Sequence, residues 1–254
     1  MERYERLRVI QDELRDPAHG VALDEAISVS VATGKMSPTV RLWRNETTLV
    51  VGRFDPKRPG FGRGVAYARE LGLTVVQRIS GGGAVLHEPG CLNFSVSIPE
   101  PEAFMGVREA FVSLCDGVIR GLETLGISCG FGRVPEAFCD GSHNLIVNGK
   151  KIAGTAQARR RGFILVHGTL FVDGNLDRMT RIINGFYRSI DEEQAETHAD
   201  AVTTLSRELG RPVSLEEVAA ALAEGYRAMG TIESGTVLKG ELEMAKLLKD
   251  EVLV

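Results

Sequence analysis

A run of three glycines at residues 81–83 separates two stretches with the pattern of β-strands, and this feature constrains the fold most. The stretch before it, TVVQRIS, is rich in β-branched residues, and CLNFSVSI after it alternates strictly. One face of the second stretch is apolar, and its other face carries Cys91, Asn93, Ser95 and Ser97. Glycine lets another group lie against bare backbone. The pattern therefore predicts a tight Gly-rich connection between strands, or a ligand lying against it, with the small polar face lining a cavity.

The glycine run does not match the common nucleotide-binding loops. Phosphate-binding glycines in those loops open a helix, whereas GGGAV is followed by a strand pattern. The sequence also lacks a Walker motif. We therefore expect neither a dinucleotide fold nor a P-loop.

The remaining pattern predicts an α+β fold. Strands 38–43 and 47–54 are expected to pair through a turn at 44–46, and residues 144–154 form a hairpin around Asn148–Gly149. A further strand is expected at 162–172. Predicted helices span 4–16, 22–33, 65–72, 101–126, 175–184, 214–229 and 240–249. Helices concentrated late in the chain favour α+β over alternating βαβ units. We expect one domain, 1–254, whose C-terminal part from about 196 to 254 is helical.

Composition excludes several classes of function. The chain has 254 residues and a net charge of −4, so nothing in its overall charge suggests nucleic-acid binding. It begins with a charged segment rather than a signal peptide, and no apolar run has the roughly 20 residues that cross a membrane. The four cysteines lack metal-ligand spacing, and the histidines are scattered, so we expect no metal site. Free thiols are typical of a cytoplasmic protein.

Two residues near the predicted hairpin are candidates for chemistry. Cys139 lies in a turn-like segment, FCDGSHNL, where a cysteine near cations could be a nucleophile or an ordinary free thiol. Lys151 follows the Asn-Gly turn and is either a solvated turn residue or a cavity residue. Alternation places it opposite Ile152, so if Ile152 faces the core, Lys151 faces whatever the glycine run binds.

Four segments in order resemble the biotin/lipoyl protein ligase superfamily, and more narrowly the lipoate–protein ligases and octanoyl or lipoyl transferases. These segments are VVGRFD, QRISGGGAVLHEPGCLNFS, NLIVNGKKIAGTAQ and VHGTL. The resemblance extends over about residues 20 to 229. It implies a mixed β-sheet flanked by helices and an enzyme that attaches an octanoyl or lipoyl group to one lysine of a lipoyl carrier domain. The implied partners are the glycine cleavage H protein and 2-oxoacid dehydrogenase E2 subunits, with an acyl carrier protein as a possible donor.

The resemblance also implies the site residues. Cys139 falls on the nucleophile position of the transferases, and Lys151 on the lysine that contacts the acyl carbonyl. The acyl or lipoyl group would be bound by Arg78, Ser80, Gly81, Gly82, Gly83, Ala84, His87, Asn93, Ser95, Gly154, Thr155, Ala156, His167 and Gly168. A transferase would need no cofactor, whereas an ATP-dependent ligase would need ATP and Mg.

Some positions depart from the family pattern. Four of them fit the ligases poorly: Asp55, Gln77, Glu88 and Cys91. His143–Asn144 replaces the aromatic-acidic pair of the transferases. We therefore expect a cysteine transferase, with a lipoate ligase that forms a lipoyl-adenylate as the alternative. A non-catalytic lipoyl-domain binder and a biotin ligase are further alternatives, and Cys91 is a rival nucleophile.

Overall fold

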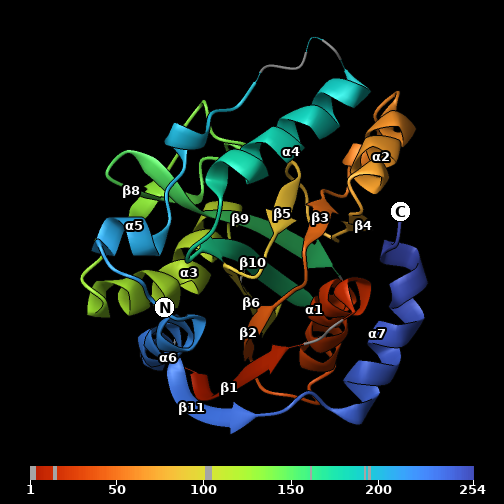
Figure 1. Ribbon diagram of the computed structural model, residues 1–254. Coiled ribbons are helices and arrows are strands. Elements are labelled where there is room, and N and C mark those ends of the chain that lie inside the picture. The colour runs from red at the N-terminus through yellow and green to blue at the C-terminus, as the bar shows by residue number, and fades with distance from the viewer. Residues whose placement is uncertain (1–3, 14–15, 101–104, 161, 192, 194–195) are drawn as a thin grey trace.

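The described part of the chain forms two β-sheets and seven α-helices (Figure 1). The structure is a computed structural model that describes residues 4–13, 16–100, 105–160, 162–191, 193 and 196–254. The first sheet has eight strands in the order β11-β1-β2-β6-β10-β9-β8-β7, and the second has three in the order β4-β3-β5. Both parallel and antiparallel pairs occur, which confirms the predicted α+β class. Within the described ranges, no helix is both long and apolar enough to span a bilayer.

The large sheet holds most of the predicted strands. Its centre pairs β6 (Cys91–Pro99) with β10 (Phe163–Phe171) and β2 (Thr39–Arg44), all antiparallel. The described strands outside this centre are β1 (Tyr4–Glu13), β7 (Gly130–Gly132), β8 (Asn144–Val147), β9 (Lys150–Arg160) and β11 (Gly230–Gly235).

The small sheet carries the glycine run. Its strands are β3 (Thr48–Val51), β4 (Thr74–Gln77) and β5 (Val85–His87), and the run lies between β4 and β5. Helices α2 (Phe61–Glu70) and α4 (Leu176–Ile190) pack together over this part of the core. The strand predicted before the glycine run is confirmed as β4. The strand predicted after it, CLNFSVSI, is β6 of the large sheet, and the short strand β5 lies between the run and β6.

Helices cover the large sheet on both faces. On one face, α3 (Val107–Thr124) and α6 (Leu215–Gly225) pack against the apolar side of β6. On the other, α1 (Pro17–Ala32) contacts β6 and β10, and α7 (Lys239–Val252) packs alongside α1 (Figure 1). A five-residue helix, α5 (Leu205–Leu209), lies in the C-terminal part. The alternation predicted for β6 is confirmed, because Phe94 and Val96 are in the apolar core and Asn93 and Ser95 lie opposite, away from that core.

Two predictions from the sequence are wrong. Residues 4–13 form β1, not a helix, and β1 pairs in parallel with both β2 and β11. Both faces of β1 are covered, with Leu7 in one core cluster and Ile10 in another, so the apolar spacing imitates a helical face. Strand β3 does not pair with β2 but lies in the second sheet. The C-terminal part also contains a strand, β11, in addition to helices.

The hairpin of β8 and β9 is confirmed in detail. Asn148 and Gly149 both have positive φ, 48° and 77°, as a two-residue type I′ turn requires. Ile152 is in the core and Lys151 lies on the opposite side of β9. Residues 101–104 of the predicted helix 101–126 lie outside the described residues, and the rest forms α3 from Val107 to Thr124.

Candidate active site

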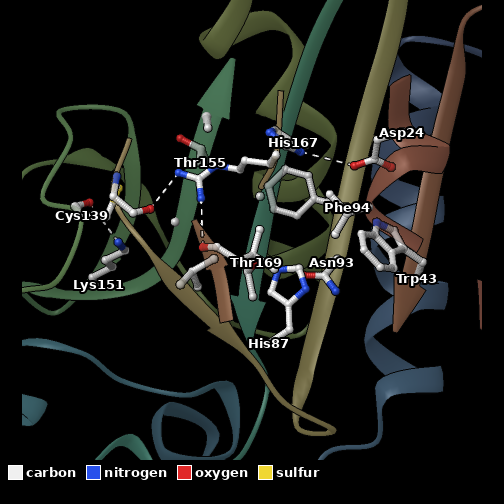
Figure 2. A pocket seen from close by; sticks show the side chains of 18 residues that line it. Asp24, Trp43, His87, Asn93, Phe94, Cys139, Lys151, Thr155, His167 and Thr169 are labelled. Carbon is white, nitrogen blue, oxygen red and sulfur yellow. Dashed lines mark hydrogen bonds and ion pairs between the residues drawn. The ribbon is translucent and has the colours of Figure 1, made fainter. Parts of the chain in front are cut away.

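A cavity lies between the two sheets, and elements far apart in the sequence line it (Figure 2). Cys139 and Lys151 are on the left side of the view, and Trp43 and Asn93 are on the right. Phe94, Thr155 and Thr169 lie between these two sides. The polar face of β6 and the neighbouring faces of β9 and β10 provide much of the wall.

Cys139 is held in an uncommon backbone conformation at the edge of the cavity. Its φ is 50°, a value that few residues other than glycine adopt. Its carbonyl accepts hydrogen bonds from Asn144 Nδ2 at 2.7 Å and from Lys151 Nζ at 3.1 Å. Its Sγ accepts the Gly83 N–H at 3.1 Å. The backbone conformation and these bonds fix the thiol against the glycine run.

Lys151 is a buried cation beside this cysteine. Its side chain is on β9 with 1% relative exposure, and Nζ donates to the carbonyls of Phe138 at 2.7 Å and Cys139 at 3.1 Å. Burial lowers the pKa of Lys151 to about 8, partly offset by the neighbouring Cys139. An ammonium has three N–H donors, and these carbonyls use two of them within the described structure. The third can meet an acyl carbonyl.

Close backbone packing explains the glycine run. Arg78 Nη2 donates to the carbonyls of Gly81 at 2.7 Å and Gly83 at 2.8 Å. Gly82 has a φ of 88°, and a Cβ there would lie 2.9 Å from Arg78 Nη2 and 3.0 Å from Cys139 Sγ. A Cβ at Gly52 would lie 1.8 Å from the Gly82 carbonyl oxygen. The glycines thus let the loop fold around Arg78 and present an N–H to Cys139.

A chain of polar side chains links Arg78 to helix α1. Arg78 Nε donates to Ser80 Oγ, which lies 2.6 Å from His167 Nε2. His167 Nδ1 lies 3.3 Å from Asp24 Oδ2. Arg41 also pairs with Asp24 at 2.7 Å. Hydrogen bonds and the Arg41 and His167 side chains hold the pKa of Asp24 below its usual value, despite a burial that opposes them.

The half-buried Tyr187 of α4 and the buried Asp55 support the glycine run together. The hydroxyl of Tyr187 accepts the Ala84 N–H at 2.5 Å and lies 3.3 Å from both carboxylate oxygens of Asp55. Asp55 Oδ2 accepts the Gly52 N–H at 2.8 Å. Burial raises the pKa of Asp55. Tyr187 and Asp55 therefore join the end of the glycine run at Ala84 to the Gly52 segment, against which Gly82 packs.

Comparison with known proteins identifies the family. A model of the Lipoyl protein ligase A/B catalytic domain matches residues 16–227. The chain belongs to the lipoyl protein ligase A/B family.

Proteins that are similar to this chain support its assignment to the family. The octanoyl-[GcvH]:protein N-octanoyltransferase of Kyrpidia tusciae is 37% identical, with 96% of this chain and 85% of that protein covered. Octanoyltransferase LipM of Brevibacillus brevis is 30% identical, covering 96% and 95%. These names agree with the predicted octanoyl or lipoyl transferase. A crystal structure of lipoate-protein ligase A bound with ATP has a TM-score of 0.78 at 24% identity, covering 97% of this chain and 94% of that one. It shares the fold.

The cavity brings together eleven of the residues predicted for the lipoyl ligase family site. They are Arg78, Gly83, His87, Asn93, Cys139, Lys151, Gly154, Thr155, Ala156, His167 and Gly168. The other five predicted residues do not line it. Three of them form hydrogen bonds instead: Ser80 with His167, Ser95 with Asp24, and the Ala84 N–H with Tyr187. A Cβ at Gly82 would lie against Cys139, and a Cβ at Gly81 would lie against Phe54. Of the three glycines, Gly83 is the one that the structure places on the wall of the cavity.

Cys91, the rival nucleophile, is away from the cavity. It packs in the core beneath the small sheet, and burial raises the pKa of its thiol to about 12. A thiol in that environment is inert. Over the described ranges, no group of three His, Cys, Asp or Glu side chains could hold a metal ion.

Sequence reasoning missed several residues of this site. Asp24 and Trp43 line the cavity from α1 and β2, and Tyr187 reaches the glycine run from α4. No local motif marks them, because each joins the site only through tertiary packing. Asn144 could have been found, since it stood out as a departure from the transferase pattern, and it holds the Cys139 carbonyl.

Proposed function

We propose that this protein transfers an octanoyl or lipoyl group to one lysine of a lipoyl carrier domain through a thioester on Cys139. The observation that carries the proposal is the contact between Cys139 Sγ and the Gly83 N–H, with the Lys151 ammonium bound to the Cys139 carbonyl. A cysteine beside a cation and a backbone donor is the arrangement of a nucleophilic thiol. Lys151 and the N–H groups of the loop would stabilise the oxyanion.

The reaction has two balanced steps. In the first, the Cys139 thiolate attacks the carbonyl of a thioester donor, a new thioester forms on Cys139, and the donor thiolate leaves. In the second, the neutral amine of the carrier lysine attacks that thioester and loses a proton. The amide forms and the Cys139 thiolate is released. Neither step consumes ATP.

The roles of the other predicted residues are part of this proposal. The acyl group would contact the predicted residues that line the cavity, namely Arg78, Gly83, His87, Asn93, Gly154, Thr155, Ala156, His167 and Gly168. The other predicted residues would hold these in place: Ser80, Gly81, Gly82, Ala84 and Ser95.

The names of the relatives favour GcvH, the glycine cleavage H protein, as a carrier. We extend the proposal to 2-oxoacid dehydrogenase E2 subunits as acceptors and to an acyl carrier protein as donor. Four free cysteines fit work in a reducing cytoplasm.

An ATP-dependent lipoate ligase is the second candidate, because an ATP-bound ligase shares this fold. The two reactions differ in their requirement for ATP with Mg and for Cys139. A third alternative is that the chain, as one domain of residues 1–254, only binds lipoyl domains. It would then form a complex with a lipoyl domain and yield no acylated product.

The test is transfer to an apo carrier domain in the absence of ATP. Purified protein is incubated with octanoyl-loaded carrier protein and an apo H protein, beside Cys139→Ser and Cys91→Ala variants. We expect octanoyl amide on the acceptor with the native chain and with Cys91→Ala, and none with Cys139→Ser. Product that appears only with free lipoate and ATP, and that survives Cys139→Ser, would instead establish the ligase.

A further inference from the structure

The end of the cavity away from Cys139 contains hydrogen-bond donors for which the described residues provide no acceptor. Trp43 and Asn93 are cross-strand partners on β2 and β6, 3% and 2% exposed, and both line the cavity. Neither Trp43 Nε1 nor Asn93 Nδ2 has a hydrogen-bond partner among the described residues. Figure 2 shows both side chains on the side of the cavity opposite Cys139 and Lys151. A buried donor without an acceptor is costly, so two neighbouring ones indicate a ligand atom that accepts from them.

The direction of the hydrogen bonds behind Asn93 fixes which atom it presents. Asn45 Nδ2 can only donate, so His87 Nδ1 accepts from it at 3.2 Å and His87 Nε2 carries the proton. That N–H donates to Thr169 Oγ1 at 3.1 Å, and the Thr169 hydroxyl donates to Asn93 Oδ1 at 2.9 Å. Burial lowers the pKa of His87 to about 3, so the ring stays neutral over the ordinary pH range. Asn93 therefore turns its NH₂ group, not its oxygen, toward the cavity.

The chemistry of this end restricts the acyl group. A methyl terminus would leave both donors unpaired. A second carboxylate is disfavoured, because the Asp24 carboxylate lines the same cavity. Sulfur is a weak acceptor that also suits an apolar wall such as Phe94.

We propose that Trp43 Nε1 and Asn93 Nδ2 form a donor pair that selects acyl groups carrying an acceptor at the far end, in particular the sulfur-bearing ring of a lipoyl group, over a plain octanoyl chain. The inference rests on the proposed function for the type of ligand. It concerns only the end of the cavity remote from Cys139.

Binding of free carboxylic acids tests this without any transfer. Titration calorimetry measures the Kd of octanoate, lipoate and 6-methoxyhexanoate, which replaces one methylene of octanoate by an ether oxygen. The variants are Trp43→Phe, which keeps a ring but lacks the N–H, and the double variant Trp43→Phe/Asn93→Leu. Val21→Ala is the matched control, because Val21 lines the same cavity and the change removes carbon but no donor.

We expect the double variant to lose affinity for methoxyhexanoate about tenfold relative to octanoate, as one hydrogen bond of ordinary net strength implies. Lipoate should shift in the same direction by less, and Trp43→Phe alone should show part of the effect. Val21→Ala should leave the ratios of the Kd values unchanged. Unchanged ratios in the donor variants would overturn the inference and indicate that trapped water serves the donors. If the double variant does not fold, the single variant decides.

The two proposals fail in different ways. Transfer through Cys139 with unchanged affinity ratios would refute the donor pair and leave the proposed function standing. Altered ratios with no acyl adduct on Cys139 would support the donor pair and refute the thioester route. An absence of binding for all three acids would count against the donor pair.

Discussion

At the scale of single residues, the burial of Lys151 is the most informative feature of the site. A fully desolvated ammonium is unfavourable unless hydrogen bonds compensate it, and the two carbonyls that Lys151 meets belong to Cys139 and the residue before it. The charge is thus directed to the loop that carries the proposed nucleophile, and it adds little to the stability of the apolar core. Its position follows from strand alternation, which is why the sequence could predict it.

Replacing Lys151 by alanine should abolish transfer while the fold stays intact. The change removes the cation that would stabilise the oxyanion, a loss of about 10²–10³ in rate for one such donor. The measurement is single-turnover acylation, with circular dichroism to confirm folding. Lys150→Ala is the matched control, because Lys150 is adjacent but exposed, and it should act normally. Normal acylation by Lys151→Ala would remove Lys151 from the mechanism.

The rate of acylation should depend on the protonation of Lys151. Its pKa of about 8 lies below the unfolded value, so the ammonium is present below about pH 8 and is lost above it. We expect the single-turnover rate to decline above about pH 8. The free energy of unfolding should increase between about pH 8 and 10.5. In that range Lys151 still holds its proton in the unfolded chain but has lost it in the folded chain. A rate that keeps rising to pH 10 would contradict the first expectation.

Tyr187 should affect the thiol without touching the substrate. Tyr187→Phe leaves the Ala84 N–H and the Asp55 carboxylate without their common partner and loosens the run that presents the Gly83 N–H. We expect the single-turnover rate of acylation to fall about tenfold and the rate at which a small reagent alkylates Cys139 to change with it. Tyr67→Phe, on the neighbouring helix α2, is the control. An unchanged alkylation rate of Cys139 in Tyr187→Phe would limit Tyr187 to a structural role.

At the scale of elements, the hairpin of β8 and β9 sets the register that buries Lys151. Gly149→Ala places a Cβ at a φ of 77°, and we expect it to lower the free energy of unfolding by about 1 kcal/mol. Gly130→Ala on the adjacent strand β7 is the control, since a Cβ there meets nothing within 4 Å and its φ is not positive. Urea denaturation measures both variants. Equal losses of stability would show that backbone strain at Gly149 is not the cause.

The predicted elements differ in reliability for physical reasons. The turn at Asn148–Gly149 and the two faces of β6 are local patterns, and the structure confirms them. Strand β1 was missed because helices and strands cover both of its faces, which removes the alternation of an ordinary strand. The pairing of β3 was mispredicted because strand order depends on contacts that no local pattern encodes.

At the scale of the whole molecule, the last helix is joined to the first strand by a buried ion pair. Arg8 on β1 meets Glu241 on α7 at 2.6 Å, with side-chain exposures of 4% and 0%. We propose that residues 1–254 are one domain, and this pair connects its ends. Glu241→Ala leaves the Arg8 charge buried and should cost about 3 kcal/mol or more.

The shape of the unfolding curve tests the single domain. We expect Glu241→Ala to move one cooperative transition, seen alike by circular dichroism and by Trp43 fluorescence. Glu243→Ala, on the exposed side of α7, should change little. Two separate transitions, with only the later part of the chain destabilised, would contradict the single domain.

Across the molecule, the sequence was sufficient for the family and for most of the cavity but not for its remote end. The motifs around residues 78–96 and 139–157 are contiguous and informative. Asp24, Trp43 and Tyr187 come from three distant elements and meet the motifs only in the folded chain. Their roles depend on packing between the sheets, which one sequence cannot supply.

Peptide mapping of the acyl-enzyme tests the thioester on Cys139 most directly. The protein is incubated with octanoyl-loaded carrier protein without ATP, quenched in acid, digested and analysed by mass spectrometry. We expect one octanoyl group, sensitive to hydroxylamine, on the peptide that contains Cys139 and none on the peptide that contains Cys91. An octanoyl group on Cys91, or transfer to the carrier lysine with no acylated cysteine at any time, would contradict the mechanism.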